Sequence, residues 1–305
     1  MRVTVTGATG LVGSALVAEL RNRGAEVTVL SREPRRASTT PAVTAVRWNP
    51  LGEPAPSESL AGRDAVVHLA GEAIAQRWSA RAKLAIRESR ARGTHNLIEG
   101  LRALEPDGPD ARPRVLISSS AIGWYGPHGE EPLDEEAPAG EDFLAQVCAA
   151  WEAQAQSAAA LGMRVVQVRT GVVLDRDGGA LAKMLTPFRL GIGGPVAGGR
   201  QYISWIHRED LVGMILAALE GEAWSGPVNA TAPEPVTNRE FSHALGRALH
   251  RPSLLPVPGF ALRVLYGEMA QIVTSGARVL PAKPLMLGYR FRHPQLEEAL
   301  RSALG

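Results

Sequence analysis

The sequence predicts an α/β fold: a Rossmann-type, doubly wound parallel sheet with a smaller mixed α/β lid subdomain in the C-terminal part. A β-branched apolar run at residues 2–5 leads into a turn with glycines at 7, 10 and 13, and apolar residues then recur at helical spacing. A second strand at 27–30 completes a strand–turn–helix–strand unit of about 30 residues. Further buried strands are predicted at 65–71, 114–118 and 164–169.

The glycine turn predicts a dinucleotide site. Gly7 permits the tight turn, Gly10 lets the backbone approach a pyrophosphate, and Gly13 lets the helix pack close to the sheet. The N-terminus of that helix offers unpaired N–H groups and the positive end of its dipole to phosphates. The alternative is a glycine-rich turn without a ligand. The residues expected to contact the cofactor here are Thr6, Gly7, Thr9, Gly10, Leu11, Val12 and Gly13.

The end of the second strand predicts which dinucleotide binds. NAD-specific sites usually place an acidic residue there, about 20 residues after the glycines, to accept from the ribose 2′-hydroxyl. Ser31 and Arg32 occupy that place in this chain, and a hydroxyl with a guanidinium suits a 2′-phosphate. Glu33 could instead serve a 2′-hydroxyl. We therefore predict NADP(H) in preference to NAD(H).

The carboxyl ends of the later strands are expected to form the other wall of the crevice, because ligands of doubly wound sheets lie at these ends. Ser118 and Ser120 are predicted to face the crevice with their hydroxyls, whereas Ser119 is expected to be a strand end capped by water. His68 lies inside its strand and is predicted to be a hydrogen-bonded core residue rather than a ligand. The further residues expected beside the cofactor are Leu69, Ala70, Gly71 and Ser118.

Composition excludes several classes of function. The chain of 305 residues has a net charge of +2, so we expect no nucleic-acid or membrane partner. No apolar run approaches the ~20 residues of a membrane span. The N-terminus enters a strand at once, and we expect no signal peptide. Cys148 is the only cysteine, which favours a reducing, cytoplasmic setting, and no metal site is predicted.

The chain is predicted to have two regions. Residues 1–174 form the dinucleotide-binding domain, which also receives segments from about 200–230. Residues 175–305 form the substrate or lid region, with a C-terminal extension over 256–305, and the five glycines of 191–199 suggest a mobile loop. Helices outside the first unit are predicted over 79–104, 142–161, 207–219, 237–249, 260–273 and 294–304.

Five motifs together resemble the extended short-chain dehydrogenase/reductase family: TGATGLVG at 6–13, DAVVHLAG at 64–71, GTHNLI at 93–98, SSSAIGWYG at 118–126 and RTGVVL at 169–174. The chain is most similar to an atypical branch of NAD(P)-dependent epimerase-family proteins, whose C-terminal extension resembles residues 256–304. The resemblance implies the fold above, a bound dinucleotide, a small-molecule substrate, and a monomer or homodimer.

The chain departs from the family at the residues that carry its chemistry. The family uses a Tyr-x-x-x-Lys pair on the helix after the serine strand, where lysine lowers the pKa of the tyrosine. The helix predicted at 142–161 contains neither residue type, and the two places fall near Leu144 and Cys148. Ser120 matches the family's catalytic serine, and the candidate substitute proton carriers are Tyr125, Glu72, Cys148 and His207. A buried, inert thiol is the alternative for Cys148.

Arginines and aromatic residues could surround an anionic or sugar-like substrate, since guanidinium groups bind phosphate or carboxylate and aromatic faces cover rings. The alternative is that the tryptophans are core residues and the arginines are solvated. The candidate substrate residues are Glu72, Arg77, Trp78, Arg87, Arg90, Arg200, Tyr202 and Trp205.

Two hypotheses on function follow. The first is an NADP(H)-dependent oxidoreductase or epimerase-like enzyme acting on a polar small molecule, such as a nucleotide sugar or a carbonyl compound. The second is a non-catalytic protein that binds NADP(H) as a redox sensor or interaction scaffold, and the missing Tyr–Lys pair motivates it.

Overall fold

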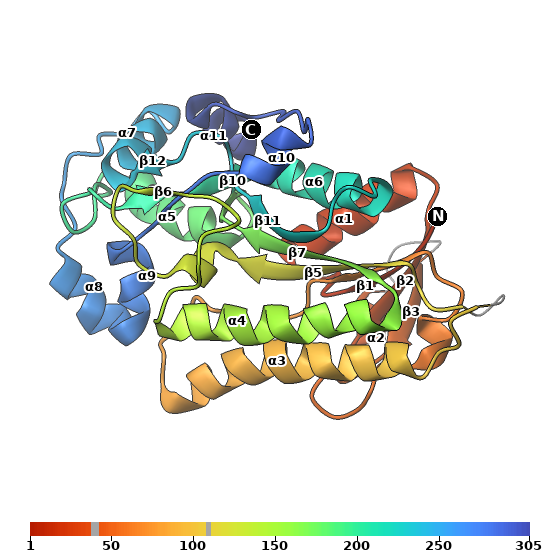
Figure 1. The fold of residues 1–305 in the computed structure, drawn as a ribbon. Coiled ribbons are helices and arrows are strands. Elements are labelled where there is room, and N and C mark those ends of the chain that lie inside the picture. The colour runs from red at the N-terminus through yellow and green to blue at the C-terminus, as the bar shows by residue number, and fades with distance from the viewer. Residues whose placement is uncertain (38–42, 108–110) are drawn as a thin grey trace.

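A seven-stranded sheet forms the centre of the computed structural model, which describes residues 1–37, 43–107 and 111–305 (Figure 1). Its strands are β1 (Arg2–Thr6), β2 (Glu26–Ser31), β3 (Val43–Arg47), β4 (Ala65–His68), β5 (Val115–Ala121), β7 (Arg164–Thr170) and β11 (Gly226–Ala230). They lie in the order β11-β7-β5-β4-β1-β2-β3, and every neighbouring pair is parallel. The predicted doubly wound parallel sheet is confirmed.

Two layers of helices cover the sheet. α1 (Leu11–Asn22) and α6 (Arg208–Glu220) pack on one face, and α3 (Ala80–Arg102) and α4 (Phe143–Gln156) pack on the other (Figure 1). Successive strand residues alternate between these layers, so that in β4 Val67 faces the first layer and Val66 the second. The strand order reverses between β1 and β4, and their diverging carboxyl ends form the crevice in which such folds bind ligands.

Side-chain caps determine where three helices begin. Ser79 accepts a hydrogen bond from the Ala82 amide at the start of α3, and Asp142 accepts from the Ala145 amide at the start of α4. Thr237 forms a capping box with the third residue of α7 (Asn238–Ala248). These starts agree with the predictions. The predicted helix over 142–161 leaves α-helical geometry at Gln156 and continues as 3₁₀ turns over 157–161.

A second, smaller apolar core lies in the region predicted as a lid. β8 (Val172–Leu174) pairs in parallel with β10 (Trp205–His207), and three helices pack around them: α5 (Gly179–Arg189), α7 and α11 (Leu296–Leu304). This region is mixed α/β, as predicted, while β11 returns from it to the central sheet. The boundary at residue 174 stays a prediction. The remaining short elements are α2 (Pro34–Ala37), β6 (Pro132–Leu133), β9 (Tyr202–Ile203), β12 (Val236–Thr237), β13 (Arg278–Val279) and α10 (Ala282–Met286).

The helix predicted over 260–273 is interrupted. α8 (Gly259–Tyr266) ends at Gly267, whose φ of 63° is outside the helical range, and α9 (Gln271–Thr274) follows only after a 3₁₀ turn. The apolar spacing continues across the break. Periodicity alone therefore predicted one continuous helix, whereas the glycine divides it into two. Within the described ranges, no helix combines the length and apolar character needed to cross a membrane.

The C-terminal segment is held to the start of α6 by a buried carboxylate. Asp210 is fully buried and accepts hydrogen bonds from the backbone amides of Arg292, at 2.7 Å, and His293, at 2.9 Å. The Tyr289 hydroxyl donates to the Asp210 carbonyl oxygen at 3.0 Å. A buried carboxylate needs such donors to offset its lost hydration. These bonds fix the segment before α11 against the helix that packs beside α1.

His68 joins three elements of the fold. It is fully buried, its Nδ1 lies 2.8 Å from Thr6 Oγ1, and its Nε2 lies 3.1 Å from Thr94 Oγ1 on α3. Thr6 Oγ1 also accepts from the amides of Leu69 and Ala70, so the threonine proton goes to Nδ1 and the histidine is neutral with its proton on Nε2. The prediction of a hydrogen-bonded core histidine is confirmed. Burial lowers its pKa from 6.5 to about 4.

His68→Gln should reduce the loss of stability in mild acid. The unfolded histidine takes up a proton near pH 6.5 and the folded one only near pH 4, so protons favour the unfolded state as pH falls between these values. This lowered pKa corresponds to roughly 3 kcal/mol of unfolding free energy. Urea unfolding from pH 7 to pH 4 should therefore show a flatter profile for the variant. His95→Gln, on the exposed side of α3, is the control. Parallel profiles for wild type and His68→Gln would contradict this account.

Candidate functional site

The glycine turn brings the ends of β1 and β4 against the start of α1. Gly7 has φ of 71°, and a Cβ built on it would lie 2.7 Å from the Leu69 carbonyl carbon. A Cβ on Gly13 would overlap the Gly7 carbonyl oxygen. Gly10 is the N-cap residue of α1 and provides no side-chain cap to the first amides of the helix. The turn therefore leaves helix N–H groups at the crevice with no side chain in front of them.

A cavity of about 210 Å³ adjoins this turn. It brings together six residues predicted to contact the cofactor, and it adds two hydroxyls at the ends of β5 and β7 that the sequence analysis did not place there, Ser119 and Thr170. Strand alternation is the signal that could have found Ser119, because Ile117 faces α1 and residues two apart share a face. The lining residues are Gly7, Gly10, Leu11, Val12, Gly13, Leu69, Ser119, Val168, Thr170, Leu211 and Ile215.

The remaining predicted cofactor residues lie around the turn in different ways. Thr9 and Gly71 are exposed and Ala70 is half-buried. Thr6 turns its hydroxyl to His68 and to the end of β4, so its side chain holds the two strands together. Ser118 is buried and makes only a 3.4 Å contact with the Ser119 carbonyl oxygen, so its side chain does not face the crevice as expected.

An exposed cation, Arg32, follows β2. Ser31 accepts a hydrogen bond from the Glu33 amide at 3.1 Å, which turns the chain directly after the strand. Arg32 is exposed and makes neither an ion pair nor a hydrogen bond with any residue in the described part of the chain. Its guanidinium is therefore available to an anionic ligand at the carboxyl end of β2.

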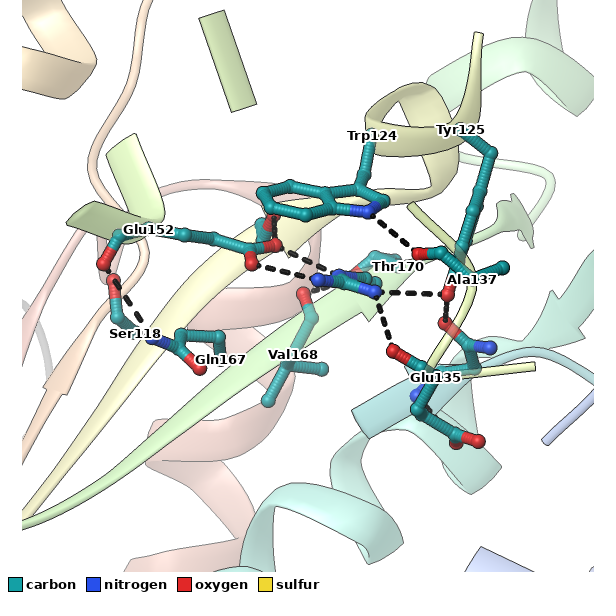
Figure 2. Close-up of polar contacts among 12 residues, drawn as sticks. Ser118, Trp124, Tyr125, Glu135, Ala137, Glu152, Gln167, Val168 and Thr170 are labelled. Carbon is teal, nitrogen blue, oxygen red and sulfur yellow. Dashed lines mark hydrogen bonds and ion pairs between the residues drawn. The ribbon is translucent and has the colours of Figure 1, made fainter. Parts of the chain in front are cut away.

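The Ser120 hydroxyl forms a hydrogen bond within the protein. Ser120 is buried, and its O–H donates to Glu152 Oε1 at 2.6 Å. The same carboxylate accepts two parallel bonds from Arg169, Nε to Oε1 and Nη2 to Oε2, both at 2.9 Å (Figure 2). A hydroxyl has one proton to donate. Contrary to expectation, this serine faces α4 and has no proton left for an oxygen in the crevice.

Arg169 organises the groups around that carboxylate. Its guanidinium lies 3.9 Å from the centre of the Trp124 ring, and it donates to the Glu135 carbonyl oxygen at 3.1 Å (Figure 2). It also donates to the Tyr125 hydroxyl at 3.0 Å. The sequence alone predicts no role for this residue. An arginine near the end of a buried strand was the available signal, because buried arginines need partners.

Tyr125 is built into this network rather than exposed to a ligand. It is almost fully buried, and its hydroxyl lies 2.6 Å from Asn229 Oδ1 and 2.8 Å from the Asp134 carbonyl oxygen. Burial raises its pKa to about 12, although the charge of Arg169 opposes the shift. A phenol that holds its proton so strongly and has no access to the crevice is poorly suited to proton transfer near neutral pH.

Cys148 has the environment of an inert thiol. It is buried on α4, where its sulfur lies beside Gly123, as does Leu144 one turn earlier. Burial raises its pKa to about 12, and the nearby charge of Arg90 lowers it too little to offset this. The positions at which the family would have a tyrosine and a lysine are thus filled by packed apolar side chains.

The candidate substrate residues differ in their exposure. Trp205 is a core residue: it is fully buried and its Nε1 donates to the Glu234 carbonyl oxygen, which corrects its prediction as a substrate contact. Trp78 is half-buried and packs edge-on against Phe143. Arg90 is buried. The exposed or half-buried others are Glu72, Arg77, Arg87, Arg200 and Tyr202.

One cluster has the residue types of a metal site. In residues 1–37, 43–107 and 111–305, potential ligand atoms of His207, Glu209 and His293 lie within 4.8 Å of one another. The two imidazole rings are only 3.8 Å apart between centres, and His207 Nδ1 accepts from the Glu209 amide. His207 Nδ1 thus caps the start of α6, and His293 Nε2 lies 3.2 Å from Glu209 Oε2. The cluster therefore forms a contact between the C-terminal segment and the helix.

Two family models match the chain. The model of the NAD dependent epimerase/dehydratase family matches residues 3–229. A model described as a domain of unknown function, DUF1731, matches residues 257–303. The chain belongs to the NAD dependent epimerase/dehydratase family, and the second match confirms the predicted resemblance of its C-terminal extension.

Relatives and solved structures support the same assignment. The chloroplastic epimerase family protein SDR39U1 homolog of Arabidopsis thaliana is 41% identical over 305 residues, which span 100% of this chain and 87% of that protein. The crystal structure of human epimerase family protein SDR39U1 (isoform 2) with NADPH is similar over 100% of both chains, with 34% identity and a TM-score of 0.86. A nucleoside-diphosphate sugar epimerase from Corynebacterium glutamicum has 35% identity and a TM-score of 0.79, over 100% of this chain and 58% of that one.

Ser120→Ala should destabilise the fold. It removes a buried, charge-assisted hydrogen bond to Glu152, and we expect the free energy of unfolding to fall by about 1–3 kcal/mol in urea titrations. Ser119→Ala is the matched control on the same strand, because no described residue is hydrogen-bonded to the Ser119 hydroxyl, and its loss should stay below about 1 kcal/mol. Equal losses in the two variants would show that the Ser120–Glu152 bond contributes nothing.

Proposed function

We propose that this protein binds NADP(H), with the pyrophosphate on the amides at the start of α1 and the 2′-phosphate on Arg32. The observation that carries the proposal is the exposed guanidinium of Arg32 directly after β2, which pairs with no residue that the structure describes, in a unit whose glycine turn leaves the amides at the start of α1 uncapped. A Cβ at Gly7 would clash with the Leu69 backbone, and one at Gly13 would clash with the Gly7 carbonyl oxygen, so the turn depends on both glycines. The human relative crystallised with NADPH supports the same cofactor.

We infer that the reaction class is that of an oxidoreductase or epimerase-like enzyme acting on a small polar molecule. When bound, the nicotinamide would supply or accept a hydride. The carbonyl-bearing or nucleotide-sugar substrate is suggested by the family and by the name of the Corynebacterium relative. Ser119 and Thr170, which line the cavity beside the turn, would position a ligand there, while Ser120 would keep the buried carboxylate in place.

A second function is favoured by one observation, the state of the candidate proton carriers. The Ser120 hydroxyl donates a hydrogen bond to Glu152, and burial raises the pKa values of Tyr125 and Cys148 to about 12. A chain with these groups could retain the cofactor without turnover. The alternative is therefore a non-catalytic protein that binds NADP(H) as a redox sensor or scaffold.

Arg32→Glu should weaken the binding of NADPH much more than the binding of NADH. Loss of a charge-assisted bond to the 2′-phosphate should raise the dissociation constant for NADPH by about 10–100-fold and leave that for NADH within about threefold. Calorimetric titration with each dinucleotide measures this. Arg301→Glu, which makes the same charge change on the exposed side of α11, is the control. Equal weakening of NADPH and NADH would mean that Arg32 does not bind the 2′-phosphate.

Turnover tests the reaction class. Across a library of carbonyl compounds and nucleotide sugars, NADPH-loaded protein should consume NADPH with at least one carbonyl compound, or NADP-loaded protein should convert at least one nucleotide sugar to its epimer with no net change in the cofactor. Cys148→Ala should keep the rate within about threefold, because the thiol stays protonated at working pH. If cofactor binds with no turnover across the library, the sensor function replaces the enzyme. A Cys148→Ala rate more than about tenfold lower would reinstate Cys148 as a catalytic group.

A further inference from the structure

Arg90 carries a buried positive charge at the end of β4. The side chain leaves α3 and is 8% exposed. Its guanidinium lies 5.0 Å from the centre of the Trp151 ring on one side. On the other side lies Gly71, where a Cβ would be 3.3 Å from the guanidinium carbon. Gly71 is exposed, so only a glycine separates this charge from the crevice surface.

The hydrogen bonds of Arg90 leave its charge without a counterion. Nη1 donates to two backbone carbonyl oxygens, those of Glu72 at 3.0 Å and Ile86 at 3.2 Å. Nε and Nη2 bond to no residue in the described ranges, and no carboxylate there lies within ion-pair distance. The Glu72 carboxylate attracts the guanidinium from further away and is itself bonded to the Gln76 amide, at 3.3 Å.

A second buried arginine, Arg169, provides a comparison for the partners of Arg90. Arg90 and Arg169 are the arginines that are buried in the described part of the chain. Arg169 has a bidentate bond to Glu152, as expected of a buried guanidinium, which stays protonated and needs an opposite charge. Arg90 has none, and burial lowers its pKa. The neighbouring Cys148 thiol is neutral and cannot compensate.

We propose that Arg90 binds an anionic oxygen, of a phosphate or a carboxylate, in a ligand that lies over Gly71. The inference rests on the proposed function, because the end of β4 touches the glycine turn through Leu69 and Gly7. Two sources offer this chemistry: the pyrophosphate of the cofactor, and an acidic group of the substrate. In either case the missing side chain at residue 71 gives the ligand access to the guanidinium, and the arginine selects for negative charge.

Arg90→Gln tests the proposal, with Arg92→Gln on the exposed side of the same helix as the matched control. If the anion is the pyrophosphate, Arg90→Gln raises the dissociation constants for NADPH and NADH alike by about tenfold or more, in contrast to the selective effect of Arg32→Glu. If it belongs to the substrate, NADPH affinity is unchanged. Inorganic phosphate then raises the melting temperature of NADPH-saturated wild type and of Arg92→Gln, but not that of Arg90→Gln.

Gly71→Ala is the second variant, because it covers the guanidinium and keeps its charge. It should reproduce the binding loss of Arg90→Gln, whichever source applies. A purely structural Arg90 predicts instead a lower melting temperature without ligand and unchanged binding of NADPH, NADH and phosphate, and that result would overturn the proposal. Wild-type protein that fails to bind NADPH would refute the proposed function. In that case, a phosphate-induced rise in the melting temperature of wild type but not of Arg90→Gln would still support the Arg90 proposal. An equal response of the two proteins would contradict it.

Discussion

The bidentate ion pair between Glu152 on α4 and Arg169 on β7 fixes the side of the crevice where this family performs its chemistry. Both groups are buried, so each depends on the other for the charge that water would otherwise balance. The pair also decides the state of its neighbours. Glu152 accepts a hydrogen bond from Ser120, and Arg169 donates one to the Tyr125 hydroxyl and lies against the Trp124 ring (Figure 2). Groups that could have moved protons are thereby made part of the core.

The opposite side of the crevice, at the glycine turn, is formed by backbone without side chains. Gly7 and Gly13 allow β1, β4 and α1 to meet through their backbones, and Gly10 leaves the helix start uncapped. Here the unused polar groups are amides and the guanidinium of Arg32. One side of the site is thus preorganised for phosphate, while the other satisfies its own polar groups internally. This difference is why dinucleotide binding follows more directly from the structure than a reaction does.

The sequence predicted the parts of this protein that depend on local pattern. The strand–glycine–helix unit, the caps at Ser79, Asp142 and Thr237, and the core position of His68 follow from residue type and spacing. The orientations at the end of β5 did not. Ser118 and Ser120 were predicted to face the crevice because they stand at the carboxyl end of a parallel strand, whereas alternation from Ile117 turns Ser119 toward it.

Pairings between distant residues lay beyond sequence reasoning. Nothing local indicates that Arg169 would meet Glu152, 17 residues away, or that Arg90 would lie under Gly71, since both contacts depend on how helices pack on the sheet. Trp205 shows the same limit: its aromatic ring suited a substrate surface, but the second apolar core buried it. Burial and charge pairing are tertiary properties, and they decided the role of each of these residues.

The C-terminal extension connects to the cofactor side through α6. Asp210, near the start of this helix, holds the backbone of residues 292 and 293, and Leu211 and Ile215 from the same helix line the cavity at the glycine turn. The extension therefore braces the helix that forms the cavity wall.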